Sequence, residues 1–153
     1  MVKLISRPYR GSDSELLQQL VATSPKWIKN ELKGMSLGDY LNQYEDISGE
    51  WRVWEKGGSP VSVTFHVDSA PSNKKPWLGT ILVKAEERRC GFASAILDIL
   101  SNEMKAKGNK ALFAGVPIDE YEWSNFLADC GFEQFKTEEN KDETFLIMVR
   151  PLE

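Results

Sequence analysis

Two spacings of hydrophobic residues alternate along this chain, and each predicts one kind of element. Apolar residues that recur every second position, or that form a short continuous run, are typical of strands, whereas a recurrence every third or fourth position is typical of helices. The pattern predicts strands at residues 2–9, 51–55, 60–67, 77–83, 111–116, 132–137 and 144–150. It predicts helices after Gly11, from Pro25 to about Leu32, from Phe92 to about Lys107 and between Glu120 and Gly131, with a further helical turn at residues 37–44.

The connections between these elements carry ordinary turn signals. Residues 56–59 read KGGS and predict a tight hairpin, residues 70–76 form a polar loop, and residues 138–143 form a charged turn between the last two strands. The resulting order, β-α-α-β-β-β-α-β-α-β-β, indicates an α/β fold (an α+β mixed sheet with flanking helices). At this length we expect a single domain that spans residues 1–153.

Charge and composition narrow the choice of function. The net charge of −4 argues against a surface that binds duplex nucleic acid, because such a surface needs clustered lysine and arginine. Two cysteines, Cys90 and Cys130, are too few for a disulfide framework, and a single histidine, His66, excludes a multi-histidine metal site. No apolar run approaches the length of a membrane span or a signal peptide. We therefore expect a cytoplasmic protein with no metal and no membrane partner.

The most informative stretch joins the strand at residues 77–83, through a charged turn at residues 84–91, to the helix that begins at Phe92. A helix N-terminus carries partial positive charge and unpaired N–H groups, so acidic or hydroxyl residues usually stand there. Here Arg88 and Arg89 precede the helix, and the cap position has no Ser, Thr, Asp or Asn. Two guanidinium groups beside a dipole of the same sign indicate a bound anion. The sequence therefore predicts a phosphate site at this junction, where Gly91 would let the anion approach the backbone.

A simpler interpretation of the same residues stays open. Arg88 and Arg89 would then be solvated turn residues balanced by Glu86 and Glu87, and Gly91 would be an ordinary turn glycine. The chain contains neither G-x-x-x-x-G-K-S/T nor G-x-G-x-x-G, so a P-loop and a Rossmann dinucleotide site are both excluded as explanations.

Two motifs carry a resemblance to a known family. Residues 88–93, RRCGFA, fit the pattern Q/R-x-x-G-x-G/A between a strand and a helix, and Val83 stands at the strand position where valine is usual. Residues 125–132, NFLADCGF, look like the aromatic-x-x-x-x-G-F end of a later helix. With the order of elements, which covers nearly the whole chain, these motifs resemble the GNAT superfamily of N-acetyltransferases.

The resemblance implies that acetyl-CoA is the co-substrate and that its acetyl group passes directly to a primary amine of a small molecule or peptide. It implies that backbone groups of the strand bind the pantetheine arm, namely those of Ile81, Leu82 and Val83. It implies that the pyrophosphate lies on backbone N–H groups, namely those of Arg89, Cys90, Gly91, Phe92, Ala93 and Ser94, with Arg88 and Arg89 supplying charge. The N–H group near Val83 would also stabilise the tetrahedral oxyanion.

The general base and the general acid are open at this point. His66 is a candidate base because an imidazole titrates near neutrality; the alternative is a hydrogen-bonded histidine on a half-exposed face of the strand at residues 60–67. Tyr121 is a candidate acid, and the alternative is a packing aromatic. The tyrosine that often serves as acid in the family aligns with Leu127, and the asparagine often found near the start of that helix aligns with Glu120. A thiol is already a fair leaving group, so these departures leave transfer feasible.

The acceptor is equally open. Residues 35–46 occupy the region that shapes the acceptor pocket in enzymes of this family, where Asp39, Glu45 and Asp46 either attract an ammonium group or form a solvated face. Two other functions remain: a non-catalytic acyl-CoA-binding sensor or interaction module and, with less support, a nucleotide-binding regulatory domain. The expected partner is the amine acceptor, with a homodimer and a longer acyl group both left open.

Overall fold

The computed structural model describes residues 3–43 and 49–153, which divide into two compact units. The first unit holds the described residues up to 67 and residues 80–93, and the second holds residues 68–79 and 94–153. One strand, β4 (Trp77–Val83), and one helix, α4 (Phe92–Ala106), contribute residues to both units. Each unit is described by itself below, and the single domain expected from the sequence stays a prediction.

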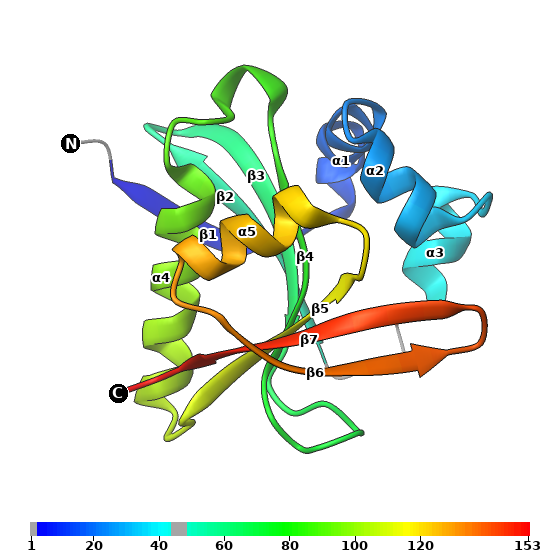
Figure 1. The fold of residues 1–153 in the computed structure, drawn as a ribbon. Helices are drawn as coiled ribbons and strands as arrows, with labels where there is room; N and C mark the ends of the chain where they lie inside the picture. Colours follow the sequence, from blue (N-terminus) through cyan, green and yellow to red (C-terminus); the bar gives the residue numbers. More distant parts are fainter. Residues whose placement is uncertain (1–2, 44–48) are drawn as a thin grey trace. The chain divides into compact units, whose positions relative to one another are not determined.

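The first unit contains three antiparallel strands: β1 (Leu4–Pro8), β2 (Gly49–Lys56) and β3 (Ser59–Val67). A tight turn at Gly57 and Gly58 joins β2 to β3, as the KGGS pattern predicts, and both glycines have the positive φ that a two-residue hairpin of this kind requires. Figure 1 shows this hairpin with β1 alongside β2. The register pairs Glu50 with His66 and Arg52 with Thr64, so these four side chains lie on one face.

Short helical elements complete the first unit. They are a 3-10 turn η1 (Gly11–Asp13), helix α1 (Ser14–Ala22), helix α2 (Pro25–Trp27), a π-helical turn η2 (Ile28–Leu32), helix α3 (Leu37–Gln43) and a 3-10 turn η3 (Ala85–Glu87). The apolar stripe of α1 packs against apolar side chains of β2, β3 and β4, and the shared core is made of Leu17, Leu20, Val21, Leu32, Tyr40, Val53, Val63 and Leu82. The helical spacing seen in the sequence therefore corresponds to the buried face of α1.

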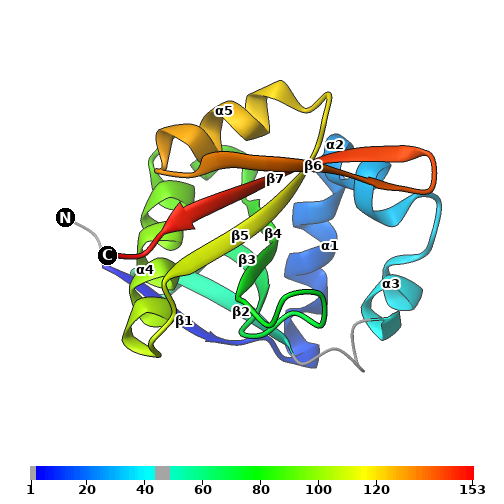
Figure 2. The same cartoon turned by 60° about the horizontal axis from the view of Figure 1, so that its bottom comes forward.

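The second unit contains β5 (Ala111–Pro117), α5 (Tyr121–Asp129), β6 (Glu133–Asn140) and β7 (Glu143–Pro151), together with most of α4. Strand β7 lies between β5 and β6 and is antiparallel to both (Figure 2). The start of β4 is parallel to β5, with Trp77 opposite Phe113. The apolar stripe of α4 is buried, as its spacing predicts, and consists of Ile96, Leu97, Leu100 and Met104.

The hydrogen-bonded order of the strands is β1-β2-β3-β4-β5-β7-β6. One parallel pair and several antiparallel pairs make the sheet mixed, which confirms the predicted α/β class and the predicted order of elements. No helix in the described part of the chain is long and apolar enough to cross a membrane.

The predicted boundary of the last hairpin was wrong. The sequence suggested a six-residue charged turn at residues 138–143, but β6 runs to Asn140 and β7 begins at Glu143, so that only Lys141 and Asp142 connect them. Glu138 and Glu139 pair across the ladder with Phe145 and Thr144. Both glutamates are exposed, so their charges stay in water while their backbone groups join the strand. The charged residues Glu138 and Glu139 therefore belong to the exposed end of β6 and not to a turn.

Asp13 is the buried acid that anchors η1 to β1. Its carboxylate accepts two hydrogen bonds from the Arg7 guanidinium, at 2.8 Å each, and one from the backbone N–H of Arg10 at 2.8 Å. The hydrogen bonds from Arg7 hold the pKa of Asp13 below its ordinary value. Since the folded pKa lies below the unfolded one, the stabilisation is present above the unfolded pKa and is lost as the pH falls through the folded pKa.

We therefore expect the substitution Asp13→Asn to lower the melting temperature by roughly 5 °C at neutral pH, because three charge-assisted hydrogen bonds are weakened together. Thermal unfolding between neutral and strongly acidic pH should show the gap between variant and parent closing as the pH falls. The matched control is Asp98→Asn, whose ion pair with Arg150 at 2.9 Å leaves the Asp98 side chain 58% exposed; its effect should be small. A gap for Asp13→Asn that is no larger than the control's, or that does not narrow in acid, would contradict this role.

Candidate functional site

The junction that the sequence singled out lies at the end of β4 and the start of α4. After Val83 the chain makes the 3-10 turn η3, and Arg88 is extended, with φ −70° and ψ 153°. Arg89 and Gly91 then adopt left-handed backbone conformations, with φ 62° and 84°, before α4 begins at Phe92. We call residues 84–91 the β4–α4 turn. Its two left-handed residues turn the backbone sharply just before the N-terminus of α4.

The β4–α4 turn leads into helix N–H groups that no nearby acidic side chain caps. The first N–H groups of an α-helix have no partner within the helix, and the first turn of α4 contains no acidic residue. Left-handed residues in a turn aim successive N–H groups to one side, which is how anion-binding nests are made. A Cβ atom added at Gly91 would meet no other atom within 4 Å, so the space beside its backbone is open. The phosphate site predicted for this turn requires both features, backbone donors and open space, and it stays a prediction.

The charged residues of the β4–α4 turn do not neutralise one another. Glu87 pairs with Lys56 at 3.1 Å, and the same ammonium lies 5.2 Å from the centre of the Phe92 ring. The guanidinium of Arg88 bonds to protein oxygens other than those of Glu86 or Glu87. Within the described residues the exposed Arg89 side chain makes no hydrogen bond or ion pair. No ion pair between these arginines and Glu86 or Glu87 occurs in the described residues, whereas the exposed Arg89 agrees with the simpler interpretation of a solvated turn residue. The phosphate site therefore stays a prediction.

Two of the strand residues expected to bind pantetheine have carbonyl oxygens that already accept hydrogen bonds from side chains of the protein. The carbonyl oxygen of Leu82 accepts a hydrogen bond from Ser62 Oγ at 2.6 Å, and that of Val83 accepts one from Arg88 Nε at 3.0 Å. Ile81 is only partly buried, in contrast to Leu82. The assignments of Ile81, Leu82 and Val83 to a pantetheine arm stay predictions.

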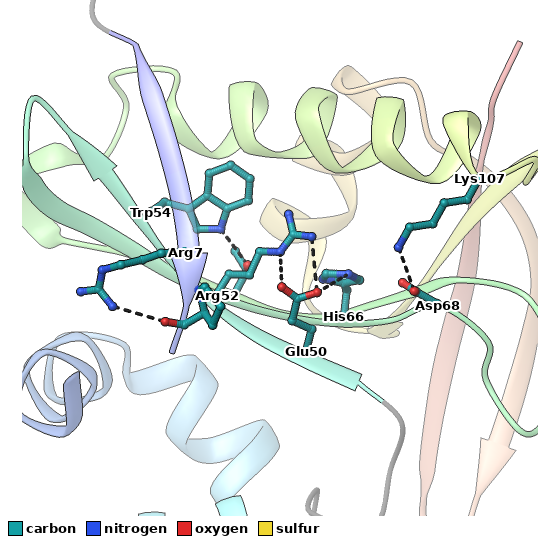
Figure 3. A network of polar contacts seen from close by, with 9 residues as sticks. Arg7, Glu50, Arg52, Trp54, His66, Asp68 and Lys107 are labelled. Carbon is teal, nitrogen blue, oxygen red and sulfur yellow. Dashed lines mark hydrogen bonds and ion pairs between the residues drawn. The ribbon is translucent and has the colours of Figure 1, made fainter. Parts of the chain in front are cut away.

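His66 lies in a buried polar row, which corrects the half-exposed face expected for β3. The imidazole is 2% exposed, and Ser62 and Thr64 on the same face are fully buried. The two hydroxyl groups tolerate burial because they are hydrogen-bonded: Trp54 Nε1 donates to Thr64 Oγ1 at 2.8 Å, and Ser62 Oγ donates to the Leu82 carbonyl oxygen at 2.6 Å. His66 Nε2 lies 4.0 Å from Glu50 Oε2, a distance longer than a hydrogen bond. Figure 3 shows Glu50 between Arg52 and His66. Arg52 Nε donates to Glu50 Oε1 at 2.7 Å, so the carboxylate beside His66 is oriented.

Tyr121 begins α5 in the second unit and is 71% exposed. The alternative of a packing aromatic is therefore wrong, whereas its role as an acid stays a prediction. Val83, His66 and residues 88–93 belong to the first unit, and Ser94 and Tyr121 belong to the second. All the expected donor-binding residues except Ser94 therefore belong to the first unit, and the expected acid belongs to the second.

The two cysteines have different surroundings. Cys90 is exposed in the β4–α4 turn, where its Sγ lies 3.5 Å from the carbonyl oxygen of Arg88. Cys130 is half-buried, and this burial raises the pKa of its thiol, which a hydrogen bond with Ser94 partly offsets. A raised pKa keeps the Cys130 thiol protonated, so that it is a poor nucleophile near neutral pH. In residues 3–43 and 49–153 no group of three or more His, Cys, Asp or Glu side chains could hold a metal ion.

The region expected to shape the acceptor pocket is partly described. Asp39 is exposed on α3, whereas Tyr44, Glu45 and Asp46 lie outside the described residues. Sequence reasoning missed a hydrogen bond between α2, which precedes this region, and β4: Trp27 Nε1 donates to Thr80 Oγ1 at 3.4 Å. No local signal reveals such a contact, because it joins residues 53 positions apart.

Comparison with known proteins gives one close relative and many similar structures. No family model matches the chain. The uncharacterized protein YkzC of Bacillus subtilis (strain 168) is 45% identical over 138 residues, which cover 90% of this chain and 96% of YkzC. An acetyltransferase from Thermus thermophilus superimposes with a TM-score of 0.75 at 21% identity, covering 98% of this chain and 97% of that one. A Desulfovibrio desulfuricans protein assigned to the GNAT acetyltransferases gives a TM-score of 0.78 at 14% identity, covering 99% and 100%. The fold is therefore that of the GNAT acetyltransferases.

Proposed function

Because the chain belongs to the family of the Bacillus subtilis protein YkzC and has the GNAT acetyltransferase fold, we propose that it is an acetyl-CoA-dependent N-acetyltransferase. The acetyl group would pass directly to a primary amine of a small molecule or peptide. The observation that carries the proposal is the open β4–α4 turn, where a left-handed Gly91 precedes helix N–H groups that have no acidic cap.

The β4–α4 turn would hold the donor by its pyrophosphate. Backbone N–H groups from Arg89 to Ser94 would donate to the phosphate oxygens, and the positive end of the α4 dipole would favour the negative charge. The exposed guanidinium of Arg89 would add a formal charge beside them. Ile81 to Val83 would bind the pantetheine arm as an added strand.

Acetyl-CoA supplies an activated thioester, so the protein has to orient it and move one proton. The N–H group near Val83 would donate to the thioester oxygen and stabilise the negative charge that develops when the amine adds. The carbon–sulfur bond then breaks, the acetyl group stays on the amine nitrogen, and the thiolate of CoA leaves. A thiolate needs little acid assistance near neutral pH. Transfer would therefore depend less on Tyr121 as the general acid than on His66 as the general base.

His66 is the proposed base that takes the amine proton. Its imidazole is 2% exposed and both ring nitrogens are buried, so the amine would not contact it, and a water molecule enclosed beside the ring would have to carry the proton. Glu50, held by Arg52, would orient the imidazole and stabilise the imidazolium form. This arrangement assigns a task to Glu50, Arg52 and His66, three of the residues drawn in Figure 3.

Release of free CoA thiol across a panel of amines tests the function. We expect at least one alkylamine or peptide amine to raise thiol release at least about tenfold above the hydrolysis of acetyl-CoA alone. An amine held next to the thioester should react faster than water does. If acetyl-CoA binds and no amine accelerates thiol release, the chain is an acyl-CoA-binding sensor or interaction module and not an enzyme. If acetyl-CoA does not bind at all, both functions are wrong.

A further inference from the structure

The guanidinium of Arg88 contacts three oxygens of the first unit. Its Nε donates to the carbonyl oxygen of Val83 at 3.0 Å, and one terminal nitrogen donates to Ser24 Oγ at 3.1 Å and to Thr23 Oγ1 at 3.4 Å. Ser24 precedes Arg88 by 64 residues, so this is a long-range contact. The side chain folds back across the β4–α4 turn and reaches the connection between α1 and α2.

The two hydroxyl groups are oriented to accept these bonds. Ser24 Oγ donates to the carbonyl oxygen of Leu20 at 2.7 Å, and Thr23 Oγ1 donates to the same carbonyl at 3.2 Å. Each hydroxyl has one proton, and once that proton is directed at Leu20, its lone pairs are free to accept from Arg88. A continuous chain of hydrogen bonds therefore runs from the end of β4 to the last turn of α1.

A second bond ties the same segment to β4. Trp27, three residues beyond Ser24, donates from Nε1 to the buried Thr80 Oγ1 at 3.4 Å, and its ring meets the Tyr40 ring edge-on with centroids 5.2 Å apart. The two contacts reach β4 at Thr80, directly before the residues proposed to bind pantetheine, and at Val83, the last of those residues. Further along the chain, α3 lies within residues 35–46, the region expected to shape the acceptor pocket.

We propose that Arg88 is a positioning residue that fixes the α1–α2 connection against the end of β4, and that its guanidinium is not a ligand of the donor's pyrophosphate. This inference rests on the proposed transferase function and deepens it. Arg88 would set the distance between the strand that carries the acetyl donor and the helices that receive the amine. Arg89 alone would supply the side-chain charge for the phosphates.

The residue type suits this task. A guanidinium is planar and presents several fixed N–H donors, so that it can bind oxygens on two sides at once. A lysine carries the same charge on a single nitrogen and cannot reproduce that fork. A phosphate ligand, by contrast, needs mainly positive charge, which lysine also provides. The substitution Arg88→Lys therefore separates the two roles.

The test is steady-state kinetics with an amine that the wild type acetylates, combined with calorimetry of acetyl-CoA, for Arg88→Ala, Arg88→Lys, Ser24→Ala and the double variant Ser24→Ala with Arg88→Ala. We expect Arg88→Ala to lower kcat/KM for the amine roughly tenfold while the Kd of acetyl-CoA changes less than about threefold. Arg88→Lys should be about as impaired as Arg88→Ala. The double variant should be little worse than Arg88→Ala alone, because both substitutions break the same tie.

Two results would overturn the proposal. The first is rescue by Arg88→Lys together with a loss of acetyl-CoA affinity in Arg88→Ala that shrinks at high salt, as for a charge on a phosphate. The second is strict additivity of Ser24→Ala and Arg88→Ala. The control is Lys136→Ala, which removes an exposed cation of β6 paired with Glu138 and should match the wild type. If the wild type acetylates no amine, the proposed function fails, whereas an active wild type with a rescued Arg88→Lys shows that only the role of Arg88 is wrong.

Discussion

The substitution Gly91→Trp is expected to weaken acetyl-CoA binding at least about a hundredfold. Two physical effects act together at this position. Gly91 has φ 84°, which other residues rarely adopt, and the indole would occupy the open space beside the backbone where a pyrophosphate would lie. Losing two charge-assisted hydrogen bonds to phosphate costs about 3 kcal/mol or more, which corresponds to roughly two orders of magnitude in Kd. Isothermal titration calorimetry with acetyl-CoA measures this change.

The chain offers a matched control in Gly108→Trp. Gly108 also has a positive φ, 92°, and an added Cβ there would likewise meet no atom within 4 Å. It follows the other end of α4, and a helix of 15 residues is about 22 Å long. The same backbone strain is therefore introduced far from the β4–α4 turn, and acetyl-CoA binding should be unchanged. Equal affinity of Gly91→Trp and the wild type would remove the β4–α4 turn as the donor site.

The substitution His66→Ala is expected to lower the rate of acetyl transfer at saturating acetyl-CoA and amine about a hundredfold, the usual contribution of a general base. An imidazole accepts a proton only in its neutral form, so a rate that depends on it rises as the pH increases through its titration. In the variant this acidic limb of the pH–rate profile should disappear, because the group that titrates is gone. Thiol release measured across the pH range gives both quantities.

A control on the same buried face separates chemistry from packing. Thr64→Val removes a hydroxyl that accepts a hydrogen bond from Trp54, two residues before His66 on β3. It should lower the free energy of unfolding by about 1 kcal/mol while the acidic limb of the pH–rate profile stays in place. An unchanged pH–rate profile in His66→Ala would show that the imidazole is a structural member of the buried polar row and not the base.

The β4–α4 junction could be predicted from the sequence because its signals are local. The apolar run of β4, the arginines and Gly91 all lie within 15 residues of one another, between Trp77 and Gly91. The structure adds what no pattern contains, which is the left-handed backbone at Arg89 and the open space beside Gly91. The local sequence was sufficient to predict this part of the fold. The predicted bounds of β4 and the predicted start of α4 at Phe92 were confirmed.

Other features depend on contacts between distant parts of the chain, and sequence reasoning missed them. Alternation in β3 indicated one polar face, which is ordinarily solvated. In the structure Trp54 and the Leu82 carbonyl, both on neighbouring strands, bond to Thr64 and Ser62 and allow the burial of these hydroxyl groups. The two arginines before α4 look equivalent in sequence. Only the fold distinguishes Arg88, whose guanidinium reaches Ser24 and Thr23, from Arg89, whose side chain extends into solvent.

The most direct test of the central claim is a crystal structure of the chain with CoA. The account predicts that the pyrophosphate oxygens lie within hydrogen-bond distance of backbone N–H groups between Arg89 and Ser94, that the pantetheine arm runs along Ile81 to Val83, and that Arg88 keeps its bond to the Val83 carbonyl. CoA bound anywhere else, or a pyrophosphate held by side chains with no contact to these N–H groups, would contradict it.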